Sequence, residues 1–130
     1  EMCIRDSAME HPLSAYYHEI AHGAGLIMLS RAYYTHFVEH CPELHDRFID
    51  MAKAMGKTDA KEPMDFVTAL VDLQKACGVD ELKMSDYGIT PEEFPKFVDN
   101  ARSTMGILFK LDRLKLTDED LVKIYTESYR

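Results

Sequence analysis

Long apolar runs are scarce in this chain of 130 residues. The longest stretch without an Asp, Glu, Lys or Arg is residues 20–30, which also contains a histidine and two glycines. It is too short and too mixed to span a bilayer, whose apolar core needs about 20 residues of helix. We therefore expect no membrane partner.

Basic residues are also in short supply. The 15 Lys and Arg stand against 23 Asp and Glu, which gives a formal net charge of −8. The phosphates of a nucleic acid would repel such a surface, so we expect no nucleic-acid partner.

Cysteines are few: Cys3, Cys41 and Cys77, with no CxxC pair. An odd number without metal-site or disulfide spacing favours reduced, buried thiols. Reduced thiols are typical of the cytosol, so we expect a cytoplasmic protein.

The sequence does contain strong helical periodicity. Apolar residues recur at three- and four-residue steps in most of the chain, and no segment shows the alternation of a half-buried strand. The pattern predicts an all-α fold, a compact bundle of five to six helices in one domain. The expected helices are residues 8–17, 22–40, 44–55, 63–77, 90–101 and 117–125.

Local signals set several of the expected boundaries. Thr90 followed by Glu93, and Thr117 followed by an acidic run, are typical helix starts. Asp59 followed by Glu62 resembles a further capping box. We expect residues 103–115 to form a loop around Gly106, and the apolar residues 26–29 to be surrounded on every side.

The most informative stretch is residues 9–30, which holds three of the six histidines. His18 to His22 spell HEIAH, which matches the HExxH motif of zinc metalloproteases. Gly23 and Gly25 continue a helix poorly, and the third histidine of the longer motif is missing. The other three histidines, His36, His40 and His45, lack a carboxylate pattern, so we expect them at the surface.

A second interpretation uses more of the chain. The pattern HPLSAYY from His11, the pair His22-Gly23, and LTDED from Leu116 together resemble the helical C-terminal domain of the iron-containing (group III) alcohol dehydrogenases. This family shares its architecture with dehydroquinate synthase. The resemblance covers essentially all of residues 8–130.

The resemblance implies a metal site of which this chain holds only a part. Members of the family bind Fe2+, or Zn2+ in some cases, through one Asp and three His. His22 matches the last of these ligands, Ser7 occupies the position of another, and the remaining two would lie upstream. His11 matches a histidine near the nicotinamide and the substrate, which implies a catalytic and cofactor-binding role.

The resemblance also implies an activity. Such enzymes are oxidoreductases that interconvert small primary alcohols and aldehydes with NAD or NADP, and the full-length protein is expected to be a homo-oligomer. The GGGS phosphate loop of the N-terminal nucleotide-binding domain is absent here, so we expect these 130 residues alone to be inactive. The alternatives are a non-catalytic helical binding module and the HExxH zinc metalloprotease.

The first seven residues, EMCIRDS, resemble the translation of an adapter used in DNA sequencing. We therefore expect residues 1–7 to be a non-native tail. The single helical metal-site domain would then be residues 8–130 of a longer protein.

Overall fold

The computed structural model describes residues 3–111 and 113–130, with side chains from residue 7 onward. The described residues form no strand, which confirms the expected all-α class. None of the described helices is long and apolar enough to cross a membrane. The α-helices are α1 (Cys3–Tyr16), α2 (His22–His40), α3 (His45–Ala54), α4 (Met64–Ala76), α5 (Phe94–Lys110) and α6 (Asp118–Ser128), and the 3-10 helices are η1 (Pro42–Leu44), η2 (Met84–Tyr87) and η3 (Pro91–Glu93).

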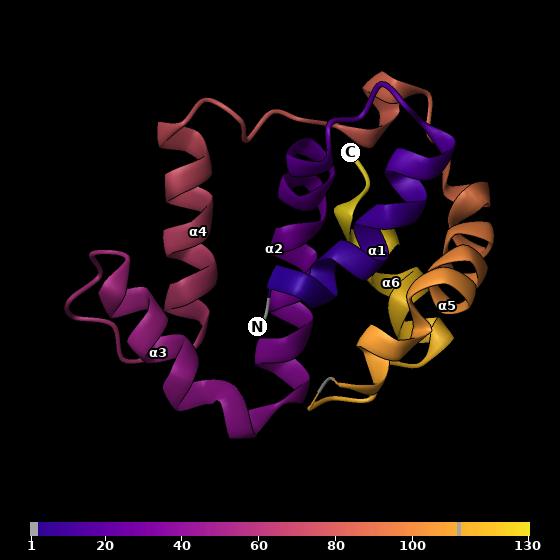
Figure 1. Cartoon of the computed structure of the whole chain (residues 1–130). Coiled ribbons are helices and arrows are strands. Elements are labelled where there is room, and N and C mark those ends of the chain that lie inside the picture. Colours follow the sequence, from indigo (N-terminus) through magenta and orange to yellow (C-terminus); the bar gives the residue numbers. More distant parts are fainter. Residues whose placement is uncertain (1–2, 112) are drawn as a thin grey trace.

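Helix α2 stands at the centre of the arrangement (Figure 1). On one side it packs against α1 and α6, and α5 in turn covers both of these helices. On the other side it packs against α4, which pairs with α3. The bounds of α2 agree with the expected helix at 22–40. Helix α1 includes part of the expected tail, and the boundary at Ala8 stays a prediction.

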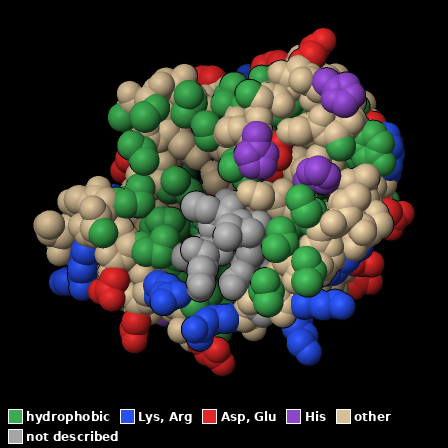
Figure 2. All heavy atoms as spheres, viewed as in Figure 1, with side chains coloured by type: hydrophobic (Ala, Val, Ile, Leu, Met, Phe, Trp, Pro, Cys, Tyr) green, Lys and Arg blue, Asp and Glu red, His purple; other side chains and the backbone are tan. Residues whose placement is uncertain are grey.

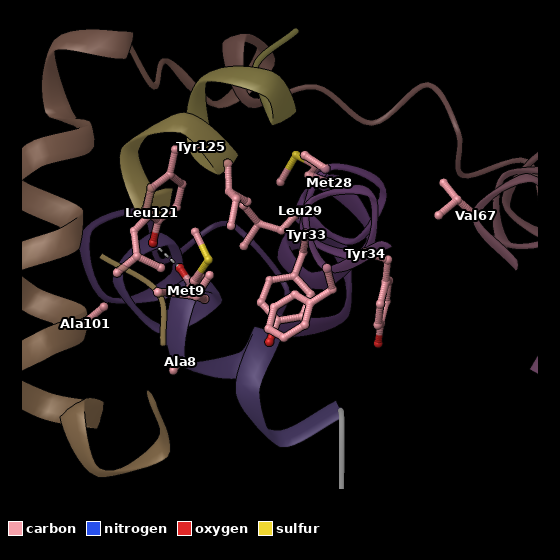
Figure 3. Close-up of a cluster of buried hydrophobic side chains, with 14 of the residues drawn as sticks. Ala8, Met9, Met28, Leu29, Tyr33, Tyr34, Val67, Ala101, Leu121 and Tyr125 are labelled. Carbon is pink, nitrogen blue, oxygen red and sulfur yellow. Dashed lines mark hydrogen bonds between the residues drawn. The ribbon is translucent and has the colours of Figure 1, made fainter. Parts of the chain in front are cut away.

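One part of the core lies where α1, α2, α5 and α6 meet, and the same cluster extends to Val67 of α4 (Figure 3). Tyr125 of α6 is fully buried, and its ring stacks on Phe94 with the ring centroids 5.6 Å apart. Its hydroxyl donates a hydrogen bond to the carbonyl of Met9 in α1, at 2.5 Å. This contact joins residues 116 positions apart and satisfies a polar group that would otherwise be buried without a partner.

Both threonine signals start helices as predicted. Thr117 accepts a hydrogen bond from the backbone N–H of Asp120 at the start of α6, and Thr90 forms a capping box with Glu93. The expected capping box at Asp59 is wrong. The carboxylate of Asp65 accepts from the backbone N–H groups of residues 61 and 62 instead, because it already lies within the first turn of α4.

The expected loop at 103–115 is wrong for residues 103–110, since α5 continues through Gly106 to Lys110, and right for the described residues 111 and 113–115. The helix is kinked at Met105, with φ −123° and ψ 15°, next to the glycine that predicted the loop. Beyond the kink, Phe109 is buried and lies under Arg102, whose guanidinium carbon is 4.8 Å from the ring centroid. Burial of a Phe side chain is worth about 1.5–3 kcal/mol, more than a helical Gly costs.

One side of α2 is more open than the sequence predicts. Leu26 and Ile27 are only half-buried, and they line a largely apolar groove of about 410 Å3 between α2 and α4. Leu73 and Cys77 line the same groove, and Leu73 is 51% exposed. The prediction that residues 26–29 are surrounded on every side is therefore wrong, because α4 covers that side of α2 incompletely. Cys77 is exposed rather than buried.

This groove predicts self-association of the chain, because exposed apolar patches drive contact with other molecules. We expect the species distribution in sedimentation velocity to shift towards monomer in Leu73→Lys. The matched control is Leu111→Lys, which changes another exposed leucine, 62% exposed, away from the groove. A wild-type chain that stays monomeric at high concentration would contradict this prediction.

The prediction that His36 lies at the surface is also wrong. It lies on the side of α2 that packs against α6, where it is 2% exposed. Its Nε2 is 3.9 Å from Oδ1 of Asp120, its ring stacks on that of His40, and its Nδ1 has no hydrogen-bond partner. Burial, and then the positive charge of His40, lower the pKa of His36, while the nearby carboxylates of Asp120 and Glu127 oppose this.

The buried histidine predicts a loss of stability in weak acid. With a lowered pKa, native His36 stays neutral when the unfolded chain already takes up a proton near about pH 6.5. Its contribution to stability is therefore complete above that pH and is lost as the pH falls below it. We expect the unfolding temperature to drop between about pH 7 and pH 5, and to drop less in His36→Gln. His18→Gln, at an exposed position, is the control and should leave the slope unchanged.

Candidate metal site

The candidate site lies at the junction of α1 and α2. Helix α1 ends at Tyr16 and α2 begins at His22, and the residues between them form a turn. The HEIAH segment is therefore not helical, and its two histidines are not one helical turn apart. This geometry contradicts the metalloprotease interpretation, which needs both histidines on one face of a helix. His18 is exposed.

His22 is the first residue of α2, and its side chain is 58% exposed. Nδ1 of its ring contacts the carboxylate of Glu10, which comes from the preceding helix α1. This contact occupies one ring nitrogen. Nε2 is therefore the nitrogen that remains for an external ligand such as a metal ion.

Glu10 is the site residue that the sequence interpretation missed. Its side chain is only 1% exposed, which is rare for an unpaired carboxylate. The hydroxyl of Ser14 donates to its Oε1, and its Oε2 faces His22. The available signal was the i, i+4 spacing of Glu10 and Ser14 on the inward face of α1, next to the fully buried Leu13.

Gly25 completes the surroundings of the carboxylate. A Cβ atom at this position would lie 2.6 Å from Cγ and 2.7 Å from Oε1 of Glu10. Real Cβ atoms do not approach other heavy atoms so closely. The absence of a side chain at Gly25 is therefore what lets the Glu10 side chain lie against the first turn of α2.

His11 follows Glu10 on α1 and is half-buried. Consecutive helical residues point in directions about 100° apart, so His11 does not share the direction of Glu10. Within the described part of the chain no direct contact joins His11 to His22. Histidine side chains nonetheless gather on one face of the molecule, over α1 and the start of α2 (Figure 2).

The described residues include no group of three or more His, Cys, Asp or Glu that could hold a metal ion. The donors present fit such an ion in kind, because an imidazole with a carboxylate on its second nitrogen is a usual metal ligand. They do not fit in number. Further ligands would have to come from outside these residues.

Two tyrosines around the site stay protonated near neutral pH. Burial, and then the negative charge of Glu10, raise the pKa of Tyr125. The hydroxyl of Tyr17 donates to Glu93, and this hydrogen bond raises the pKa of Tyr17 to about 12. The Tyr17 contact fixes the end of α1 to the start of α5, so its role is structural.

A helical domain with a carboxylate-supported histidine at a helix start is a candidate metal-binding domain. Comparison with known proteins specifies the family. The model of the Fe-containing alcohol dehydrogenase family, C-terminal, matches residues 5–129. The chain therefore belongs to this family, as its sequence pattern predicted.

The relatives are alcohol dehydrogenases. The chain is 30% identical, over 131 aligned positions, to the long-chain primary alcohol dehydrogenase AdhA of Thermoanaerobacter ethanolicus, and the match covers 94% of this chain and 31% of AdhA. It is 25% identical to an archaeal halo-thermophilic alcohol dehydrogenase from a Red Sea brine pool, with a TM-score of 0.87 over 95% of this chain and 32% of that one. A mutant of the same archaeal enzyme matches with a TM-score of 0.84. The chain spans about a third of the length of these relatives.

The close approach at Gly25 predicts opposite outcomes for two neighbouring glycines. Gly25→Ala should lower the free energy of unfolding by about 1–3 kcal/mol, because the new methyl group displaces the Glu10 side chain. Gly23→Ala meets nothing within 4 Å, so it should be neutral or stabilise α2 by up to about 1 kcal/mol. Urea unfolding followed by circular dichroism measures both. Equal stability of the two variants would contradict the packing described here.

Proposed function

We propose that this chain is the metal-site part of an NAD(P)-dependent alcohol dehydrogenase that interconverts primary alcohols and aldehydes. The observation that supports this most directly is the contact between Nδ1 of His22 and the buried carboxylate of Glu10. It orients the ring in the way that metal-binding histidines are oriented. Membership of the Fe-containing family supports the same proposal.

In this proposal His22 binds Fe2+ or Zn2+ through Nε2. Such an ion would supply a Lewis acid that lowers the pKa of the substrate hydroxyl. Two of the remaining ligands would come from the upstream part of the full-length protein, and the third would stand at the position that Ser7 occupies here. Imidazole nitrogen suits iron and zinc equally well, so His22 does not select between them.

His11 has a separate role in the proposal. A half-buried imidazole beside the site can take a proton from the substrate side and release it to solvent. The nucleotide-binding domain would hold NAD or NADP, whose chemistry is hydride exchange, while this chain would contribute placement and proton transfer. Both roles of His11 require that domain.

The proposal also includes a cytoplasmic, homo-oligomeric full-length protein. The two cysteines whose side chains are described, Cys41 and Cys77, are free, which suits a reducing compartment. An apolar groove between α2 and α4 offers surface for further segments or subunits.

The test is to recover the coding sequence upstream of Ala8 and to express the full-length enzyme. We expect metal-dependent reduction of NAD or NADP with primary alcohols of increasing chain length, and no activity from the 130 residues alone. His22→Ala should lower kcat/KM by at least about 100-fold, since it removes a metal ligand. The matched control, His18→Ala, removes an exposed histidine of the same turn and should leave kcat/KM unchanged.

Three results would overturn the proposal. One is an upstream reading frame without a nucleotide-binding motif. Another is full activity of His22→Ala in the metal-loaded enzyme. The third is NAD(P)-linked alcohol oxidation by the isolated 130 residues.

A further inference from the structure

We propose that Glu10 is a positioning residue that sets the tautomer of His22, so that Nε2 keeps its lone pair for a metal ion. The statement about the metal rests on the proposed function. The statement about the tautomer does not, because it concerns only contacts within this chain.

The burial of Glu10 is the first argument. A carboxylate that is 1% exposed needs partners, since an isolated buried charge is strongly unfavourable. Oε1 has such a partner in the hydroxyl of Ser14. Oε2 is a buried oxygen without a hydrogen-bond partner among the described residues, and its ion-pair contact is with Nδ1 of His22.

The chemistry of the pair gives the tautomer. An ionised carboxylate can only accept hydrogen bonds, so the nitrogen that faces it must carry the proton. That nitrogen is Nδ1 of His22. In the neutral ring the proton on Nδ1 leaves Nε2 unprotonated, and unprotonated nitrogen is the form that binds a metal.

Two further residues keep Glu10 in this orientation. Ser14 lies one helical turn along α1 and holds Oε1. Gly25 leaves room for the carboxylate, because any Cβ there would overlap it. The same carboxylate therefore contacts the end of α1 and the first turn of α2, and it links the direction of the His22 ring to the packing of both helices.

The tautomer can be measured directly on the 130-residue chain. Long-range 1H–15N correlation spectra of the 15N-labelled chain, at about pH 8 where histidine is neutral, distinguish a proton on Nδ1 from one on Nε2. We expect His22 to carry its proton on Nδ1. In Glu10→Gln we expect the proton to move wholly or partly to Nε2. Glu19→Gln, which changes an exposed carboxylate of the adjacent turn, is the control and should leave the spectrum of His22 unchanged.

A second variant guards against misfolding. If circular dichroism shows that Glu10→Gln has lost helix, Ser14→Ala takes its place, because it loosens Oε1 and keeps the carboxylate. A wild-type His22 with its proton on Nε2 overturns the proposal, whatever the variants do. Retention of the Nδ1 proton in a folded Glu10→Ala, which leaves no side-chain acceptor at this position, overturns it as well, because another group would then be setting the tautomer.

Titration with Zn2+ separates this inference from the proposed function. We expect Zn2+ to shift the Nε2 resonance of His22, with an affinity about 10- to 100-fold lower in Glu10→Gln, the usual effect of losing such a carboxylate. An Nδ1–H tautomer without any zinc response would leave the positioning by Glu10 intact and remove His22 as a metal ligand. A zinc response on a ring that carries its proton on Nε2 in the absence of zinc would overturn the positioning by Glu10 and keep His22 as a metal ligand.

Discussion

The contact between the buried carboxylate of Glu10 and the ring of His22 is the constraint on which the candidate site depends. A carboxylate removed from water must be compensated, and here the compensation comes from a neighbouring helix across a short turn. The turn between α1 and α2 is therefore constrained, because a shift of α1 against α2 would separate Glu10 from His22. Ser14 of α1 donates a hydrogen bond to this carboxylate, and Gly25 of α2 leaves room for it. A polar group in the interior thus specifies how the two helices meet.

The rest of the fold holds that junction in place. Tyr125 reaches from α6 to the carbonyl of Met9, one residue before Glu10, and Tyr17 reaches from the end of α1 to Glu93 at the start of α5. These bonds join residues 116 and 76 positions apart, so the site is built on the tertiary structure and not on the local motif alone. Burial raises the pKa of Tyr125, and the charge of Glu10 adds to this effect. Both tyrosines therefore keep the hydroxyl protons that make these bonds.

The features that the sequence predicted are those set by neighbouring residues. Thr117 starts α6 because its hydroxyl meets a backbone N–H three residues on, and that relation is visible in the chain itself. The predictions that were wrong concern features set by contacts with distant parts of the chain. Gly106 weakens a helix locally, and α5 is kinked at Met105, but it continues to Lys110 with Phe109 buried against the core. His36 and Glu10 are polar residues whose burial depends on partners in other helices, or across a turn, and no spacing rule reports that.

The same distinction applies to the orientation of His22 in the proposed enzyme. The residues that support His22 all lie between positions 10 and 25, and the helices that fix them all belong to this chain. The described residues nevertheless form no group of three metal-binding side chains. Orientation of the ring and completion of the coordination shell are therefore separate problems. The first is solved by the packing of α1 on α2, and in the proposed enzyme the second is left to the segment that precedes them. In the proposed enzyme an ion would meet a histidine ring already in contact with Glu10, which would lower the entropic cost of binding.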